Sequence, residues 1–253
     1  LVPCGTTGES ATLTDHERIA VISHCVRTVN GRIPVIAGTG SNQTAHTLRL
    51  SQEAKKAGAD GLLLVTPYYN KCSATGLIRH YLSVADSVEL PIIIYNVPSR
   101  TGVSMNAEIY RQLSRHPLIN GVKEASGSTD LVLRTLDACG DELNIWSGND
   151  GQIVPIMALG GKGVISVLAN LCPKVTRELT AACLRGDYET AASMQKQYMA
   201  LIDALFCEVN PIPVKTAMNL MGLGVGPLRM PLCQLDDGKK ERLISALHQK
   251  NLI

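Results

Sequence analysis

The segment PIIIYNVPSRTG, residues 91–102, begins with a continuous apolar run and ends in polar residues. Successive isoleucines, with no polar residue alternating between them, are typical of a strand that is buried on both faces. Five other short runs have the same character, at residues 33–38, 61–66, 119–124, 143–148 and 163–167. Such continuous runs predict a parallel sheet that is covered on both sides by helices.

Helical segments separate these predicted strands. Residues 44–57 have a helical period and are followed by Gly58, and residues 106–115 begin at Asn106, a favourable N-cap. The strands start roughly 20 to 30 residues apart, which is typical of repeated βαβ units. Repeated units of this kind require parallel strands, so we expect an α/β fold.

An open doubly wound sheet and a closed barrel both fit this alternation, and the ends of the strands separate them. In an open sheet, ligands gather at one switch point, whereas a barrel collects reactive groups from many strands around one mouth. Polar or reactive residues follow almost every run here, namely Thr39, Thr66, Tyr68, Tyr69, Tyr95, Asn96, Lys123, Glu124, Ser147, Asn149 and Ser166. The pattern favours a (β/α)8 TIM barrel.

The two ends of the chain define the limits of this barrel. We interpret LVPCG (residues 1–5) as a seventh strand, with the capping box TDHE (residues 14–17) starting the next helix. The remaining βα unit, about 30 residues long, is then expected upstream of residue 1. Long helical segments follow the last strand, at residues 174–185, 187–206 and 239–250. We therefore predict a barrel lacking its first βα unit over residues 1–185 and a C-terminal helical region over residues 186–253.

Composition points to a small-molecule partner. The net charge is +2 with Lys and Arg scattered, so nothing indicates binding to nucleic acid, and no apolar run approaches the roughly 18 residues that span a membrane. The eight cysteines contain no C-x-x-C pair, which predicts free thiols in a cytoplasmic protein. GTGSNQ (residues 38–43) lacks the third glycine of a dinucleotide fingerprint, and no histidine motif indicates a metal, so we expect no cofactor and no metal.

Lys123 is the most informative candidate for chemistry. It lies inside the apolar run INGVKE, where burial lowers the pKa of a lysine and makes its neutral amine a nucleophile towards carbonyls. The alternative is a structural lysine paired with Glu124 or another carboxylate of the barrel. Adjacent side chains of a strand face opposite sides, which weakens the pairing with Glu124 but leaves the alternative open.

Three further residues come from strand ends or the loops beyond them. Tyr95 and the Thr7 hydroxyl make sense as a proton shuttle for imine formation at Lys123, although a tyrosine there is more often a packing residue. Arg100 offers a planar fork for a carboxylate, although a solvated surface arginine is the commoner case. The turn GTTGE (residues 5–9) is able to bind an anion through its N–H groups, or it is an ordinary strand-to-helix turn.

GTTGE, TPYYN, YNVPSRTG and GVKEAS occur in this order, and together they resemble the dihydrodipicolinate synthase family of pyruvate-dependent class I aldolases, which includes N-acetylneuraminate lyase. The resemblance extends to SGND, GVISV and NPIPVK and so to essentially the whole chain. It implies a lyase that condenses pyruvate with L-aspartate 4-semialdehyde to 4-hydroxytetrahydrodipicolinate, in diaminopimelate and lysine biosynthesis. The alternatives are another pyruvate-dependent aldolase, such as a keto-deoxy sugar acid or sialic acid lyase, and a non-catalytic barrel.

The resemblance also implies roles for individual residues. Lys123 would form the Schiff base with pyruvate, with Tyr95 as the acid/base residue. Thr7 would link Tyr95 to Tyr69, which in the family is lent by the neighbouring subunit of a tetramer built from tight dimers. Arg100 would bind the carboxylate of the aldehyde, as in the synthases and unlike the sialic acid lyases. The pyruvate pocket would be formed by the backbone around Thr6 and Thr7 and by Gly148 and Ile165.

A feedback site for lysine is a further implication of the resemblance. Residues matching the family's allosteric cleft are Ser10, Ala11, Leu13, Asn42 and Tyr68. Asp15 and His46 replace the histidine and glutamate of lysine-sensitive members. A histidine in place of the glutamate that grips the ammonium group predicts weak or absent inhibition by lysine.

Overall fold

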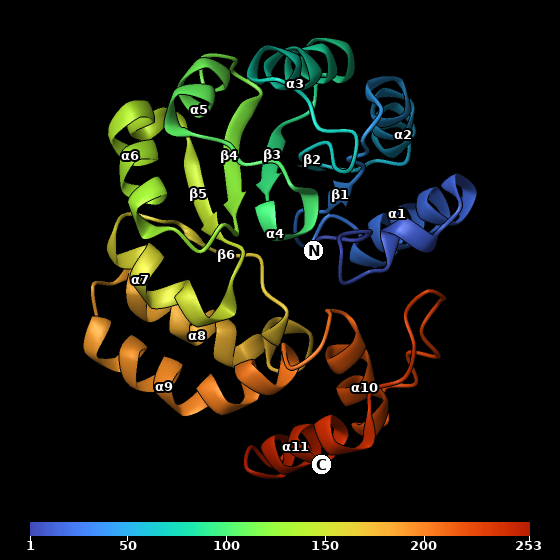
Figure 1. Ribbon diagram of the computed structural model, residues 1–253, viewed down its shortest axis with the longest axis vertical. Coiled ribbons are helices and arrows are strands. Elements are labelled where there is room, and N and C mark those ends of the chain that lie inside the picture. Colours follow the sequence, from blue (N-terminus) through green and yellow to red (C-terminus); the bar gives the residue numbers. More distant parts are fainter.

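Six parallel strands form one curved sheet in which each strand pairs with its sequence neighbours, in the order β1 to β6. The computed structural model describes all residues 1–253, and helices cover the outer face of the sheet (Figure 1). This arrangement confirms the predicted alternation of strands and helices. The strands are β1 (Ile36–Gly38), β2 (Gly61–Val65), β3 (Ile92–Asn96), β4 (Ile119–Glu124), β5 (Asn144–Ser147) and β6 (Gly163–Val164).

Eleven α-helices accompany the sheet, with four short 3₁₀ turns. The predicted helix at residues 44–57 is present as α2. The three predicted C-terminal helices are present as α8, α9 and α11, whereas α10 was not predicted. The helices are α1 (Asp15–Val29), α2 (Thr44–Lys56), α3 (Ala74–Val88), α4 (Pro98–Thr101), α5 (Ala107–Leu113), α6 (Thr129–Cys139), α7 (Ile153–Ala158), α8 (Pro173–Leu184), α9 (Tyr188–Leu205), α10 (Ile212–Leu220) and α11 (Asp237–His248).

Side-chain caps explain where two of the predicted helices begin. Thr14 and Glu17 form the complete capping box in front of α1, each bonding to the backbone N–H of the other. The Asn106 side chain accepts from the N–H of Ile109 at the start of α5. Both caps satisfy N–H groups that have no partner within their helix.

The segment at residues 1–5 differs from the expectation, because it is not a strand of the sheet. The carbonyls of Leu1 and Pro3 accept from the N–H groups of Ile36 and Gly38 in β1, so the segment does lie beside that edge. Pro3 has no N–H to donate in return, and Cys4 has a positive φ of 58° that turns the chain away. The sheet therefore has six strands and not seven, and the βα unit expected ahead of residue 1 stays a prediction.

The last predicted strand, at residues 163–167, is also shorter than expected. Only Gly163 and Val164 pair with β5 in the sheet, and one further backbone bond joins Ile165 to Ser147. Beyond this point the N–H groups of Val167 and Leu168 turn to the carboxylate of Asp150 instead of continuing along β5. A side chain thus ends the strand by taking over the backbone donors.

The apolar core has an outer part and an inner part. A cluster of 26 buried residues lies between the sheet and its covering helices, and includes Leu62, Leu64 and Ile94 from successive strands. The opposite faces of β2 and β3 contribute a small inner cluster that contains Leu63 and Tyr95. Alternate residues of each strand thus point to opposite faces, both of them apolar, as the continuous runs predicted.

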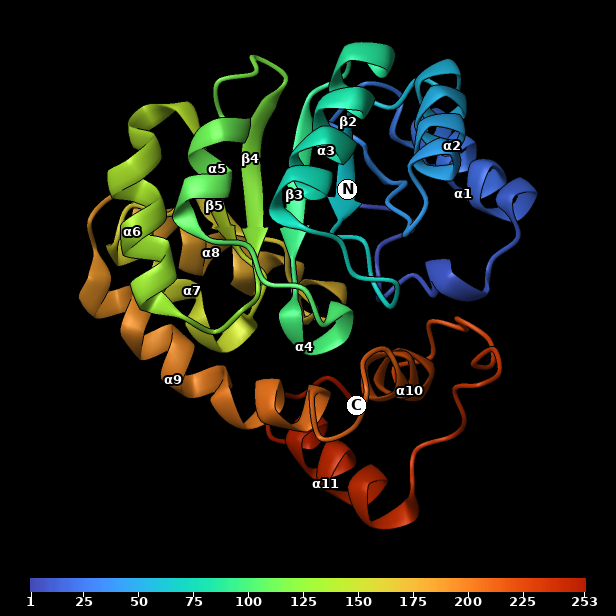
Figure 2. The same cartoon turned by 45° about the horizontal axis from the view of Figure 1, so that its top comes forward.

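The C-terminal helices α9 to α11 lie on the side towards which the C-terminal ends of the strands point (Figures 1 and 2). They share a second core of 15 buried residues with the segment that follows β6, including Leu168 and Leu171. This placement brings Asn210 and Leu232 to a cavity that is also lined by the candidate residues Tyr95 and Arg100. No helix combines the length and the apolarity needed to cross a membrane.

Candidate active site

Lys123 and Tyr95 are neighbours on adjacent strands. They are paired directly in the register of β3 and β4, and the Lys123 Nζ lies 4.1 Å from the centroid of the Tyr95 ring. Residues paired in this way across two strands point to the same face of the sheet. Both side chains therefore project into the interior of the curved sheet, near the C-terminal ends of their strands.

Burial changes the acid–base chemistry of both groups. It lowers the pKa of Lys123, the negative charge of Asp150 raises it and the positive charge of Arg100 lowers it, and the net result is a pKa of about 8. Burial also raises the pKa of Tyr95, against the lowering effects of a hydrogen bond with Thr6 and of Arg100. At neutral pH the site therefore holds an amine that loses its proton readily beside a phenol that retains one.

The pairing of Lys123 with Glu124 does not occur. The Glu124 carboxylate faces the outer side of the sheet, where it accepts from the Asn96 amide at 3.1 Å and the Tyr110 hydroxyl at 2.9 Å. Its other partner is the N–H of Ser126 at 2.8 Å. Lys123 forms no ion pair within 4 Å, so no carboxylate is in direct contact with its ammonium group.

Gly148 and Ile165 approach the lysine from β5 and from the end of β6. A Cβ on Gly148 would lie 3.3 Å from Lys123 Cε and only 2.6 Å from Ala125 Cβ, so the position requires glycine. Ile165 bonds to the carbonyl of Ser147 at 2.9 Å and packs against the inner cluster that contains Tyr95. These two residues form one wall beside Lys123.

The turn at residues 5–9 lies at the same mouth. The Thr7 hydroxyl accepts from the amide of Asn210 at 3.0 Å, and the backbone carbonyl of Asn210 accepts from Arg100 Nη2 at 3.0 Å. Asn210 therefore joins the turn to α4. No bond links Thr7 to Tyr95 here, so the expected relay contact of Thr7 is replaced by one with Asn210.

Two adjoining cavities meet at this turn. One, of about 310 Å³, is lined by Thr6, Tyr95, Arg100 and Asn210. The other, of about 580 Å³, is lined by Thr6, Thr7, Lys123 and Ile165. Lys123 and Tyr95 thus open into different cavities, and Thr6 borders both. A small keto acid at the junction would be within reach of both side chains.

Tyr69 is the predicted residue that the structure does not bring to the site. Its side chain is 90% exposed, it has a positive φ of 71°, and it lines neither cavity. Tyr68, next to it, is 36% exposed and lines the smaller cavity. In the loop after β2, Tyr68 therefore faces the cavity of this chain and Tyr69 faces the solvent.

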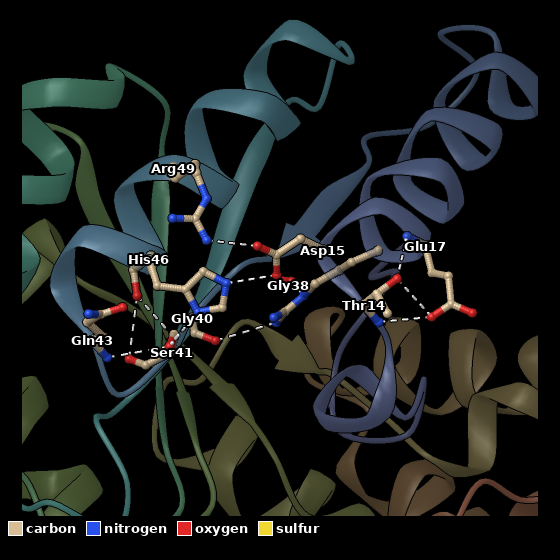
Figure 3. Close-up of polar contacts among 11 residues, drawn as sticks. Thr14, Asp15, Glu17, Gly38, Gly40, Ser41, Gln43, His46 and Arg49 are labelled. Carbon is tan, nitrogen blue, oxygen red and sulfur yellow. Dashed lines mark hydrogen bonds and ion pairs between the residues drawn. The ribbon is translucent and has the colours of Figure 1, made fainter.

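Asp15 and His46, the two replaced positions of the predicted effector cleft, are bonded to each other in a polar network (Figure 3). His46 Nε2 lies 2.8 Å from Asp15 Oδ1, and Arg49 Nη2 lies 2.8 Å from Asp15 Oδ2. Hydrogen bonds from Arg49 and His46 hold the pKa of Asp15 below its usual value. Asp15 is thus already paired by two partners. Of the predicted cleft residues, Ser10, Ala11 and Tyr68 line the smaller cavity, whereas Leu13 and Asn42 do not.

Sequence reasoning missed three contributors to this region. Asn210 and Asp150 lie in the segments NPIPVK and SGND, which served only to extend the resemblance. Glu9, in the left-handed region with a φ of 54°, pairs with Lys215 of α10. Burial raises the pKa of Glu9, but the Arg229 N–H, Lys215 and the charge of Arg229 lower it more, so it stays below its usual value. No group of three or more His, Cys, Asp or Glu side chains is arranged to hold a metal ion.

Comparison with known proteins places this geometry in a family. The model of the dihydrodipicolinate synthetase family matches residues 1–250. A 4-hydroxy-tetrahydrodipicolinate synthase of Thermoanaerobacter sp. (strain X514) is 52% identical over 254 residues, covering 100% of this chain and 86% of that protein. One from Geobacter sulfurreducens is 50% identical over 253 residues, covering 100% and 87%.

A solved structure agrees with these sequence matches. The crystal structure of the chloride-inhibited dihydrodipicolinate synthase from Acinetobacter baumannii, complexed with pyruvate, superposes with a TM-score of 0.97 at 42% identity. The superposition covers 100% of this chain and 87% of that one. With a lysine beside a tyrosine at the strand ends and agreement in sequence and fold along the chain, this protein belongs to the dihydrodipicolinate synthetase family.

Proposed function

We propose that this chain is a 4-hydroxy-tetrahydrodipicolinate synthase in which Lys123 forms a Schiff base with pyruvate. The observation that carries the proposal is the pair formed by Lys123 and Tyr95, with 4.1 Å between the Nζ and the ring centroid and the pKa of the lysine lowered to about 8 by burial. The neutral Nζ attacks the C2 carbonyl of pyruvate to give a carbinolamine. The Tyr95 hydroxyl donates one proton to the carbinolamine OH group, which leaves as water, and a protonated imine remains. The names of the relatives support the condensation of this adduct with L-aspartate 4-semialdehyde.

The neighbouring residues have roles that follow from their positions. Tyr95 transfers the proton, because burial keeps its phenol protonated next to the amine. Thr6 and Thr7 hold the pyruvate carboxylate at the turn, and Gly148 and Ile165 limit the pocket around the methyl group. Arg100, which lines the smaller cavity, binds the carboxylate of the aldehyde through its planar fork. The Schiff base forms on substrate pyruvate itself, so no separate cofactor is needed.

Borohydride trapping tests the proposed Schiff base. Borohydride with pyruvate should reduce the imine and leave one stable adduct on the peptide containing Lys123. Lys123→Ala should lose both the adduct and turnover, whereas Lys162→Ala, at an exposed lysine, should retain both. Full turnover of Lys123→Ala would show the mechanism to be wrong. Product formation with aspartate semialdehyde, but not from sialic acid or a keto-deoxy sugar acid, separates the synthase from other pyruvate aldolases.

Tyr69 belongs in the proposed relay only if a second subunit receives it. Its exposure and its distance from both cavities support a role across an interface, with Thr7 connecting it to Tyr95 in the assembled enzyme. The proposed assembly is a homotetramer built from dimers. The proposed division of the chain, at residue 185, separates the strand-bearing part from a helical region that supplies Asn210 and Lys215 to the site.

Feedback inhibition by lysine is proposed to be weak or absent. An incoming ammonium group needs a free carboxylate, and the Asp15 carboxylate is already bonded to His46 and Arg49. Lysine would have to displace both partners to use it. An activity assay at increasing lysine concentration should show little inhibition, and inhibition at micromolar lysine would refute the proposal.

A further inference from the structure

The two carboxylate oxygens of the buried residue Asp150 differ in their hydrogen bonding. Asp150 lies just after β5, in the 3₁₀ turn Asp150–Gln152, and is 2% exposed. Oδ2 accepts from the N–H groups of Val167 at 3.0 Å and Leu168 at 2.9 Å. Oδ1 is buried and has no partner at hydrogen-bond geometry. Burial raises the pKa of Asp150, against the lowering effects of the Ser166 hydroxyl, the two N–H groups and the charge of Lys123. Burying a carboxylate with one oxygen unpaired is costly, so its presence calls for a role.

The position of Asp150 connects it to the lysine. It follows Gly148, whose Cα is so close to Lys123 that an added Cβ would lie 3.3 Å from Cε. The two residues that it bonds follow Ile165 and Ser166, which line the cavity into which Lys123 opens. The backbone carbonyl of Asp150 accepts from the Gln195 side chain at 2.6 Å, so this bond anchors the turn to α9.

The other charged groups around Lys123 are either cationic or already paired. Arg100 lies on α4 and Tyr95 on β3, while Glu124 points to the opposite face of β4. Glu9 and Lys215 line the same cavity and pair with each other. Asp150 is the carboxylate whose charge raises the pKa of Lys123 against the effect of burial.

We propose that Asp150 is a positioning residue that acts on Lys123 as a fixed counter-charge and holds the Ile165 wall in place through Val167 and Leu168. The inference rests on the proposed function, because the cation that it serves is the Schiff base of pyruvate on Lys123. When the neutral amine adds to the carbonyl and the resulting hydroxyl group takes a proton from Tyr95 and leaves as water, the nitrogen remains as a protonated imine. A preorganised negative charge stabilises this cation in surroundings that exclude water.

The same charge has an opposite effect on the free enzyme. It stabilises the protonated amine, which is not the nucleophile, so it keeps the pKa of free Lys123 higher than burial alone would set it. Removing the charge should therefore let the free lysine react at lower pH. It should also weaken the imine that forms. A residue that only holds the fold together would produce neither effect.

Asp150→Asn tests this with a change of charge at nearly constant size. Its amide oxygen still accepts from Val167 and Leu168, and its amide nitrogen replaces the unpartnered Oδ1. The acid limb of kcat/KM for pyruvate should move down by about half a pH unit or more. In the same variant kcat should fall by about tenfold. An unchanged acid limb in a variant with wild-type thermal unfolding would overturn the inference.

Gln195→Met serves as the matched structural control. It removes the bond to the Asp150 carbonyl and leaves the carboxylate in place, so its acid limb should match the wild type. An equal shift in Gln195→Met would assign the effect to structure and overturn the inference. If Asp150→Asn does not fold, Asp150→Ser replaces it and must show the same downward shift. Borohydride trapping of the wild type with pyruvate keeps the two proposals distinct, because no adduct there means that the proposed function itself fails.

Discussion

At the scale of single residues, the site depends on how closely the backbone approaches Lys123. The chemistry of Lys123, Tyr95 and Arg100 made them visible in the sequence, because a charged or phenolic group at the end of an apolar strand is unusual. Their partners were not visible, because Asn210 reaches Thr7 across 203 positions of the chain. A contact between residues so far apart depends on how the helices pack, and no local pattern encodes it.

Gly148→Ala should disturb the site more than its small size suggests. The added methyl would lie 2.6 Å from Ala125 Cβ and 3.2 Å from the Glu124 carbonyl, so β4 or β5 has to move. We expect a loss of about 1–3 kcal/mol in the free energy of unfolding and a lower yield of the borohydride adduct. Gly238→Ala is the control, since its Cβ would meet nothing within 4 Å. Wild-type stability and trapping in Gly148→Ala would contradict the packing argument.

At the scale of elements, helices with side-chain caps were predictable, and elements that depend on distant partners were not. The N-cap residues Thr14 and Asn106 indicated from the local sequence alone where α1 and α5 begin. The last strand was expected to continue to residue 167, but Asp150 takes its N–H groups after Ile165. Helix α10 was not predicted because of two prolines, yet Pro211 is its N-cap residue and Pro213 fits its first turn.

His80 of α3 should make the protein sensitive to mild acid. Its Nδ1 pairs with Thr44 at 2.9 Å, its Nε2 is buried without a partner, and burial lowers its pKa from 6.5 to about 4. Between these two values the unfolded chain takes up the proton and the folded one does not. The free energy of unfolding should therefore fall by up to about 3 kcal/mol as the pH drops from 6.5 to 4, and be unaffected above 6.5.

Urea unfolding at pH 7 and pH 5 measures this contribution. In His80→Leu the difference between the two pH values should shrink by more than 1 kcal/mol, the contribution expected of about 1.4 kcal/mol per unit of pKa shift. His24→Leu replaces an exposed histidine and should leave the difference unchanged. If His80→Leu retained the full difference, the acid sensitivity would have another origin.

At the scale of the whole molecule, the N-terminal turn and the C-terminal helical region form one structure. Glu9 pairs with Lys215 and accepts from the N–H of Arg229, and the Arg229 side chain pairs with Glu17 of α1. The sequence predicted that helices would follow the last strand, but not that they would lie over the strand ends. That placement depends on contacts of residues 207–235 with the other end of the chain.

Mixed subunits should show whether Tyr69 acts across an interface. Tyr69→Phe and Lys123→Ala should each have little activity alone, since one lacks a relay hydroxyl and the other the nucleophile. Co-expressed, they should regain a part of the wild-type turnover, because some sites combine an intact Lys123 with a partner's intact Tyr69. Purified mixed assemblies and each variant alone provide the comparison. Activity no higher than that of the separate variants would place Tyr69 outside the relay.

The bond between Thr7 and Asn210 has a consequence for folding during translation. Thr7 leaves the ribosome early, but the residue that fixes its hydroxyl is made 203 positions later. At about 5–20 residues per second, the turn waits roughly 10–40 s for its partner. A nascent chain can thus form all six strands and bury Lys123 well before the turn at residues 5–9 is fixed by Asn210. The amine should become useful only after Asn210 has been made and has bound Thr7.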